Sequence, residues 1–63
     1  MCEIKAFLKK DKVEELILED IDFVKVKENG EISLRNIFGE EKIIKAKIKE
    51  INLSKHKIIL IPL

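Results

Sequence analysis

The sequence predicts an all-β protein, a small antiparallel barrel or rolled sheet of about six strands, built as a single domain over residues 1–63. Three observations support this prediction. Apolar residues recur at every second position through much of the chain, which is the period of a half-buried strand. Short turn sequences separate these segments, as in antiparallel hairpins. Near residue 49 the apolar phase slips by one, and the β-bulge that this indicates would bend a long strand and curve the sheet.

The first strand is predicted at the start of the chain, where every second residue is apolar: Cys2, Ile4, Ala6 and Leu8. This phase places Cys2 on the core-facing side, at the very end of the strand. The next segment, residues 11–21, fits two patterns, because its apolar residues match a helical stripe as well as a strand. We interpret it as a strand, since the segments on both sides have clear strand patterns.

The stretch DFVKVKENGEISLRN predicts a hairpin whose register can be derived. A two-residue loop would set apolar residues opposite polar ones on the same face of the sheet. A three-residue loop that ends at Gly30 instead pairs Lys27 with Glu31 and Val26 with Ile32, which satisfies both faces. Gly30 then occupies the left-handed position of a G1 bulge.

The C-terminal part of the chain predicts a long strand and a final hairpin. A tight turn at Gly39 leads into the stretch EKIIKAKIKEINL, which carries the phase slip. A four-residue loop over residues 54–57 would then set Leu53 opposite Ile58. Pro62 ends the last strand, because it has no N–H to donate to a strand ladder.

The small size of the chain predicts self-association. A chain of 63 residues buries only about 60% of the surface that its unfolded state exposes, and a homodimer would add to this burial. A single cysteine cannot form an internal disulfide, and no paired Cys/His spacing indicates a closed zinc site. Phe23 is expected in the core. Phe7 is out of phase with its neighbours and is expected in a subunit interface or on the surface.

Composition argues against several classes of function. Thirteen basic and twelve acidic residues give a formal charge of +1, which does not favour a nucleic-acid partner. No apolar run is long enough to span a membrane, and Glu3 and Lys5 interrupt the apolar start of a signal peptide, so we expect a cytoplasmic protein. With one His, one Cys and two Ser, and little room for a concave pocket, the chain is not expected to be an enzyme.

A row of lysines is one candidate site. Lys45, Lys47 and Lys49, together with Lys42, are expected along one outward strand face, where they could follow a phosphate backbone. Exposed lysines at this spacing are equally typical of a soluble strand that must be protected from edge pairing. Three Phe residues and no Tyr or Trp leave few platforms for stacking bases. RNA binding by a small β-barrel is therefore the alternative function.

Cys2 is the other candidate, although a lone Cys at a strand end is ordinarily a small apolar residue. If Met1 is removed, the thiol belongs to the N-terminal residue, and its sulfur, the α-amine and the amide nitrogen of Glu3 lie within chelating reach of one ion. Sulfur and nitrogen donors in a plane suit Ni(II) or Cu(II). Two chains related by a two-fold axis could supply four donors. His56 lies in a polar turn and is expected in solvent.

The chain resembles the CooT-type small nickel-binding proteins, a family also catalogued as predicted RNA-binding proteins. The resemblance rests on the start MCEIKAFL, the segment LILEDIDFVKV, the turn ENG, the stretch IFGEEKIIKAKIKEINL and the final HKIILI. It implies a cytoplasmic homodimer of small β domains that binds Ni(II) through Cys2. It also implies a recipient nickel enzyme, such as carbon monoxide dehydrogenase. Glu3 departs from the small or apolar residue expected at its position.

Overall fold

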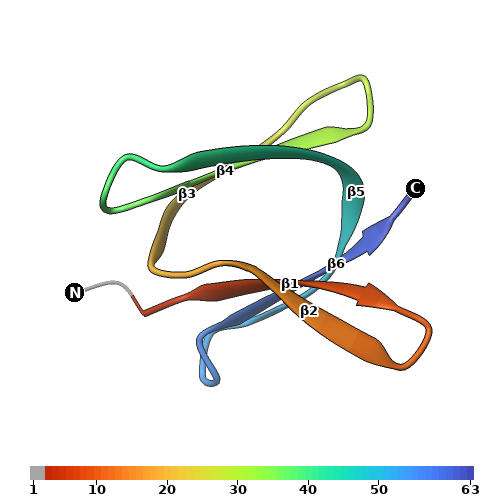
Figure 1. The fold of residues 1–63 in the computed structure, drawn as a ribbon, viewed down its shortest axis with the longest axis horizontal. Coiled ribbons are helices and arrows are strands. Elements are labelled where there is room, and N and C mark those ends of the chain that lie inside the picture. The colour runs from red at the N-terminus through yellow and green to blue at the C-terminus, as the bar shows by residue number, and fades with distance from the viewer. Residues whose placement is uncertain (1–2) are drawn as a thin grey trace.

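The computed structural model describes residues 3–63, which form six strands and no helix. These strands are β1 (Lys5–Lys10), β2 (Val13–Leu18), β3 (Ile21–Val26), β4 (Glu31–Asn36), β5 (Glu41–Asn52) and β6 (Lys57–Pro62). They form one sheet in the order β2-β1-β6-β5-β4-β3 (Figure 1). The all-β prediction is confirmed, and β2 shows that the ambiguous segment at residues 11–21 contains a strand.

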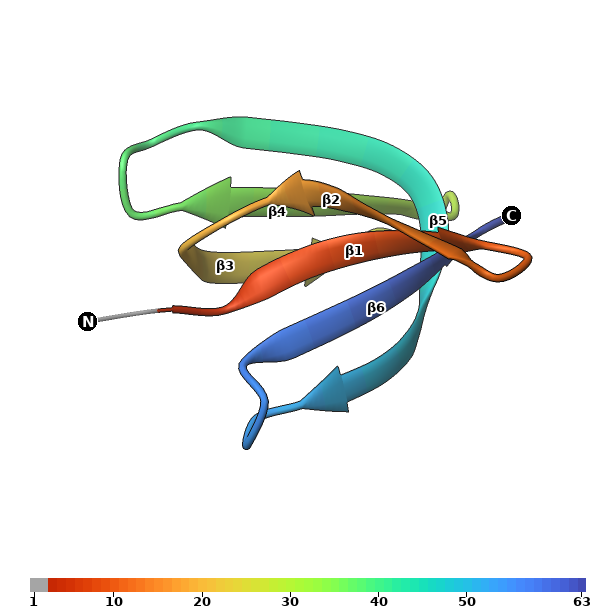
Figure 2. The same cartoon turned by 60° about the horizontal axis from the view of Figure 1, so that its bottom comes forward.

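The sheet is rolled but not closed into a barrel, so the second of the two predicted architectures is the one observed. The 12-residue strand β5 bends strongly, and it pairs with β4 through its first half and with β6 through its second (Figure 2). The register with β6 shifts between Ile48 and Glu50, which confirms the predicted bulge. Strands β2 and β3 remain as the two edges of the sheet.

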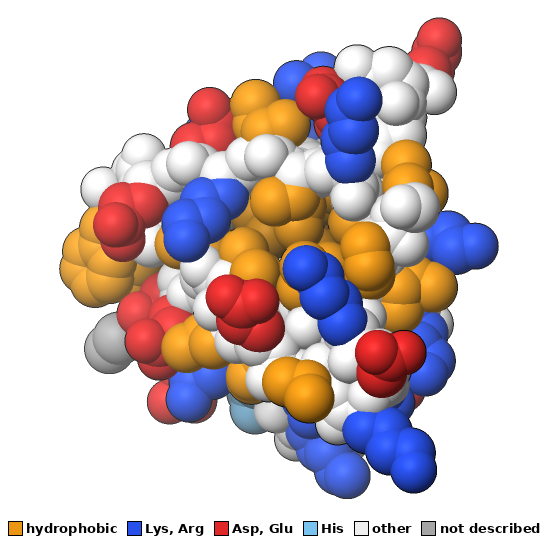
Figure 3. All heavy atoms as spheres, turned by 45° about the vertical axis from the view of Figure 1, so that its right-hand side comes forward, with side chains coloured by type: hydrophobic (Ala, Val, Ile, Leu, Met, Phe, Trp, Pro, Cys, Tyr) orange, Lys and Arg blue, Asp and Glu red, His pale blue; other side chains and the backbone are white. Residues whose placement is uncertain are grey.

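The hydrophobic core lies on the concave face of the roll. Ile32, Leu34 and Leu60 are its largest fully buried side chains, and they come from β4 and β6. Because side chains alternate across a strand, β1, β4, β5 and β6 contribute every second residue to this face. The core cluster consists of Ala6, Leu18, Ile21, Ile32, Leu34, Ala46, Ile58 and Leu60. Figure 3 shows hydrophobic side chains gathered at the centre of one face of the molecule, with charged side chains around them.

The β3–β4 hairpin has the predicted register. The amide of Lys27 donates to the carbonyl oxygen of Glu31 at 2.8 Å, and Val26 lies opposite Ile32. Gly30 has a φ of 84°, the left-handed conformation that the three-residue loop requires. The strand pairing and the conformation of Gly30 therefore both match the predicted three-residue loop.

Gly30→Ala and Gly39→Ala should destabilise the protein by similar amounts. Both glycines have a φ of 84°, and a left-handed conformation costs an L-residue about 1–2 kcal/mol. A Cβ at Gly30 would lie 2.6 Å from Cδ1 of Leu63, whereas a Cβ at Gly39 would meet no atom within 4 Å. The Leu63 side chain is 69% exposed and can move aside, so this contact should add little to the cost. Urea denaturation of the two variants measures the difference, and a much larger loss of stability at Gly30 would show that Leu63 is held in place against the loop.

The predicted register of the final hairpin is wrong. Asn52 pairs with Lys57 and Ile51 with Ile58, whereas we predicted Leu53 opposite Ile58. The loop comprises residues 53–56, because the side chain of Asn52 closes it by accepting hydrogen bonds from the backbone and side chain that follow. Leu53 is consequently 67% exposed.

The predicted core position of Phe23 is also wrong, since this side chain is 41% exposed. The β3–β4 register shifts between Ile21 and Phe23, and this irregularity moves Phe23 to the convex face while Ile21 stays in the core. On that face the guanidinium carbon of Arg35 lies 4.8 Å from the centre of the Phe23 ring. Phe7 is half-buried, and the ammonium of Lys57 lies 5.0 Å from the centre of its ring.

Candidate metal centre

Cys2, the predicted metal ligand, lies outside the described residues, as does Met1. The residues that follow it are described and show where the start of the chain enters the sheet. The amide of Lys5 donates to the carbonyl oxygen of His56 at 3.0 Å, and the amide of Ile21 donates to the carbonyl oxygen of Ile4 at 2.9 Å. The chain therefore enters β1 between the β5–β6 turn and the β2–β3 turn (Figure 1).

We call the region formed by Ile4, Lys5, Glu19, Asp20 and His56 the N-terminal end of the sheet. Both acidic and basic side chains lie in this region. The ammonium of Lys5 is 3.8 Å from the Glu19 carboxylate, and both side chains are about half exposed. An ion pair this exposed contributes little to the stability of the fold, but it keeps the Glu19 carboxylate close to the Lys5 ammonium.

His56 is held in this region by the β5–β6 turn. The side-chain oxygen of Asn52 accepts hydrogen bonds from the hydroxyl of Ser54 at 2.8 Å and from the amide of Lys55 at 3.1 Å. The amide of His56 donates to the carbonyl oxygen of Leu53 at 3.3 Å, and His56 itself has a φ of 54°. His56 is exposed, as predicted. Its proximity to the start of β1 was not predicted, because it arises from the parallel β1–β6 pairing, which has no local sequence signal.

A pocket of about 320 Å³ opens beside the N-terminal end, between β2 and the β4–β5 turn. The charged residues that line it are Glu19, Asp20, Glu40 and Lys42, and its apolar residues are Leu16, Ile17, Leu18 and Phe38. Among residues 3–63, no group of three or more His, Cys, Asp or Glu side chains is placed to hold a metal ion.

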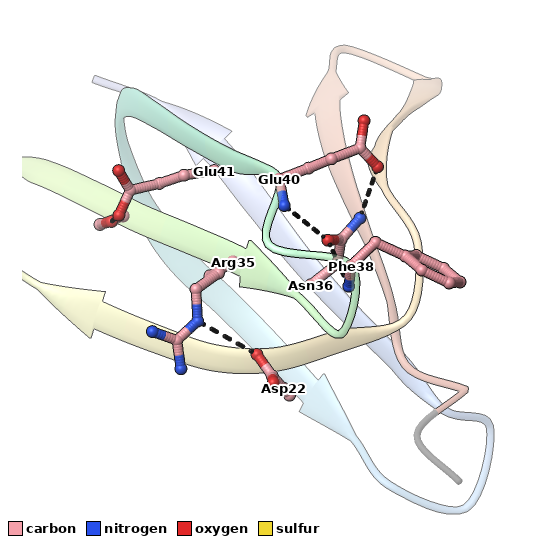
Figure 4. A network of polar contacts seen from close by, with 7 residues as sticks. Asp22, Arg35, Asn36, Phe38, Glu40 and Glu41 are labelled. Carbon is pink, nitrogen blue, oxygen red and sulfur yellow. Dashed lines mark hydrogen bonds and ion pairs between the residues drawn. The ribbon is translucent and has the colours of Figure 1, made fainter.

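The β4–β5 turn forms one wall of this pocket, and the side chain of Asn36 holds that turn in place (Figure 4). Its side chain is 4% exposed, and its oxygen accepts hydrogen bonds from the amides of Phe38 at 3.0 Å and Glu40 at 2.9 Å. Its amide nitrogen donates to the Glu40 carboxylate at 2.8 Å. Sequence reasoning identified the turn at Gly39 and missed this network, although an Asn three residues before a Gly is a typical turn signal.

The four candidate lysines do not lie along one face. Lys42 is exposed but lies opposite Leu34 on the concave side of β5 and lines the pocket, so its predicted place on the face of Lys45 and Lys47 is wrong. Lys45, Lys47 and Lys49 are exposed. Lys45 and Lys47 follow the alternation of β5, and Lys49 lies at the bulge. The outward row is thus shorter than predicted.

An acidic residue lies close to the lysines near the bulge. Lys57 donates a hydrogen bond to the Glu14 carboxylate at 2.8 Å, and this contact, with the charges of Lys57, Lys9 and Lys49, lowers the pKa of Glu14 below its usual value. The positive potential on this part of the surface is therefore partly neutralised. A uniformly basic track for a phosphate backbone does not extend along it.

The fold and the entry point of the chain define a class: a small all-β protein made of one open, rolled sheet, in which Ile4 and Lys5 lie between two turns. A family model described as CO dehydrogenase accessory protein CooT matches residues 1–61. The chain belongs to this family, which confirms the resemblance seen in the sequence. An accessory protein serves another enzyme, and this role fits the expectation that the chain is not itself an enzyme.

A solved structure supports the same assignment. The crystal structure of a protein assigned as CooT from Carboxydothermus hydrogenoformans is 45% identical to this chain, with a TM-score of 0.89, and the match covers 98% of each chain. No curated protein matches the sequence. No helix that could cross a membrane occurs among residues 3–63.

Proposed function

We propose that this protein binds Ni(II) and stores or delivers it for the maturation of a nickel enzyme such as CO dehydrogenase. The observation that carries the proposal is the match to the CO dehydrogenase accessory family over residues 1–61, a range that includes Cys2, the only thiol of the chain. Nickel is the cargo of this protein, and its release to the enzyme requires a site that is tight but open to exchange. A site at the chain terminus meets that requirement.

The donors at the N-terminus suit nickel. After removal of Met1, Cys2 would offer a thiolate and an α-amine, whose ordinary pKa values are about 8.5 and 8, so a bound metal ion can deprotonate both at neutral pH. Ni(II) favours such sulfur and nitrogen donors in tetragonal geometry. One chain offers too few of them for a tight site, and we place the ion between the Cys2 residues of two chains in a cytoplasmic homodimer.

Exposed apolar side chains support the homodimer. Phe38 is 72% exposed and Leu53 is 67% exposed. Scattered single apolar residues are normal on a protein surface, so these two matter for where they lie. Phe38 lies in the β4–β5 turn and Leu53 in the β5–β6 turn, and the second turn contacts the start of β1. A partner placed there would bring a second N-terminus to the first.

A Ni(II) titration of tag-free protein tests this function. We expect a saturable sulfur-to-nickel charge-transfer band, because the thiolate of Cys2 is the proposed ligand. A vector-derived extension before Cys2 removes the free α-amine and should weaken binding. Binding without any charge-transfer band would show that the thiolate is not a ligand.

RNA binding remains the alternative function, and one observation favours it. Phe23 and Arg35 form an exposed stacked pair on the convex face of β3 and β4, a platform of the kind that holds unpaired bases. The guanidinium is also held by Asp22, whose carboxylate lies 3.5 Å from Nε (Figure 4). This function predicts a gel shift of single-stranded RNA that weakens steeply with salt. The absence of any shift at low ionic strength would exclude it.

A further inference from the structure

Strand β2 has a free edge. It pairs with β1 on one side and, among residues 3–63, with no strand on the other. Lys10 lies opposite Val13 across the two-residue turn between β1 and β2, and backbone hydrogen bonding alternates from this pair along the antiparallel ladder. The backbone groups of Glu14 and Leu16 therefore point away from β1. An added strand would form its hydrogen bonds with these groups.

The free edge of β2 borders the pocket beside the N-terminal end. Leu16 of β2 lines one side of this pocket, and Phe38 of the β4–β5 turn lines the other. The amide of Ile37 donates to the carbonyl oxygen of Asp20 at 3.0 Å, which ties the two sides together. The buried side chain of Asn36 holds the β4–β5 turn in shape (Figure 4), so the pocket is preformed. Main-chain groups and a side-chain pocket therefore lie next to each other.

Lys42 gives this pocket a cation without a partner. It is exposed and forms no ion pair within the described part of the chain. Two acidic residues of the lining are already engaged, because Glu19 is in an ion pair and Glu40 accepts a hydrogen bond from Asn36. An acidic side chain is the group that Lys42 would bind. Asp20 lies in the same lining with the opposite charge, so this contact should add specificity more than affinity.

We propose that an extended segment of the recipient enzyme adds to the free edge of β2, with an apolar side chain in the pocket and an acidic side chain at Lys42. This inference rests on the proposed function, in which CO dehydrogenase receives the cargo. Strand addition takes its affinity from main-chain hydrogen bonds and its specificity from side-chain pockets. None of the residues that line the pocket belongs to β3, so the pocket selects β2 over the other edge of the sheet.

The charges on β2 also have a simpler explanation. Charged residues on an edge strand keep copies of a protein from pairing, and Glu14 and Glu15 serve this purpose. They disfavour the β2 of a second copy more than a segment whose acidic side chain lies at Lys42. The second chain of the proposed homodimer is expected near Phe38, so the test variants are placed in β2 and β5 instead.

The first experiment measures amide hydrogen exchange of tag-free protein with and without purified nickel-free CO dehydrogenase. The amides of Glu14 and Leu16 should exchange rapidly in the free protein and slowly in the complex. The amide of Glu15 faces β1 and serves as the internal reference. The amide of Val26 points outward from β3 by the same alternation, and its exchange should not change.

The second experiment measures the affinity of variants for the same enzyme, each with a matched control on β3. Leu16→Ala removes an apolar side chain from the pocket and should weaken binding about 10-fold, as for an interface anchor. Lys42→Glu should also weaken it. Val26→Ala and Lys25→Glu make comparable changes on the other edge and should bind as wild type. All four side chains are exposed, and thermal unfolding checks the fold. Wild-type affinity of both the Leu16 and Lys42 variants would exclude the pocket from the contact.

The outcomes separate this inference from the function on which it rests, because a Ni(II) titration of the same samples reports cargo binding. If the wild type binds nickel but forms no complex, or a complex in which the β2 amides stay unprotected, the docking site is wrong and the nickel function stands. If the β2 amides are protected by the enzyme and no nickel binds, the docking site stands and the cargo is wrong. Protection that rises with the concentration of the protein alone would show a second copy at this edge and contradict the inference.

Discussion

Cys2→Ser should abolish saturable Ni(II) binding at neutral pH, with affinity at least ~100-fold weaker than wild type, since loss of even an outer-shell partner can cost as much. The physical reason is the difference between the two side chains. A thiol with a pKa near about 8.5 is readily deprotonated by a bound metal, whereas a serine hydroxyl is not. The chain has no second thiol to replace it. The charge-transfer band should disappear together with binding.

Glu3→Gln is the matched control for this variant. It changes the neighbouring residue, removes one charge and leaves the thiol, the α-amine and the Glu3 backbone amide unchanged. We expect the same charge-transfer band and an affinity close to that of wild type, because a screened surface charge changes local potential only modestly. A Cys2→Ser protein that binds nickel as tightly as the Glu3→Gln protein would contradict the proposed site.

Leu34→Ala should destabilise the fold more than any surface change. Leu34 is fully buried in the core cluster between β3 and β5, and truncation of a buried Leu to Ala costs about 2–5 kcal/mol. Whole domains are stable by only about 5–15 kcal/mol, and small ones lie at the low end. The variant is therefore expected to be partly or largely unfolded at room temperature. Urea denaturation followed by far-ultraviolet circular dichroism measures the effect.

Val13→Ala provides the comparison for the core variant. Val13 is 68% exposed at the start of β2, so its truncation should change the free energy of unfolding by no more than about 0.5 kcal/mol. Similar unfolding midpoints for the two variants would mean that Leu34 is not in a packed core.

The sequence predicted the parts of the fold that depend on local patterns. Period-two alternation identified the strands except β2, whose segment also fitted a helix, and Gly30 fixed the register of the β3–β4 hairpin because only one loop length satisfied both faces. The bulge in β5 was visible as a slip of the apolar phase at residues 48–50. Each of these features is decided by neighbours in the chain.

The errors arose where the structure depends on irregularities or on distant pairing. The register shift near Phe23 changes which residues of β3 face inward, and we missed its sign in the sequence, a slip of the apolar phase between Phe23 and Val24. The side chain of Asn52 sets the length of the final turn, so the apolar pattern alone gave the wrong register there. The parallel β1–β6 ladder joins the two ends of the chain, and no local signal could place His56 beside Lys5.

The sequence identified some of the candidate site residues and misplaced others. Cys2 was identified because it is the only thiol and lies at the second position, and it stays a prediction because it lies outside the described residues. Lys42 was expected in the row with the other lysines, but it lines the pocket on the concave side. His56 was assigned to solvent, and its position at the N-terminal end became apparent only from the assembled sheet.

The measurement that tests the central claim most directly is the metal stoichiometry of the protein with its native N-terminus, determined by native mass spectrometry. The same spectrum shows whether Met1 has been removed and whether the ion is carried by one chain or two. We predict one nickel ion per pair of chains, with Cys2 as the first residue. One nickel ion bound to each separate monomer would contradict the shared site.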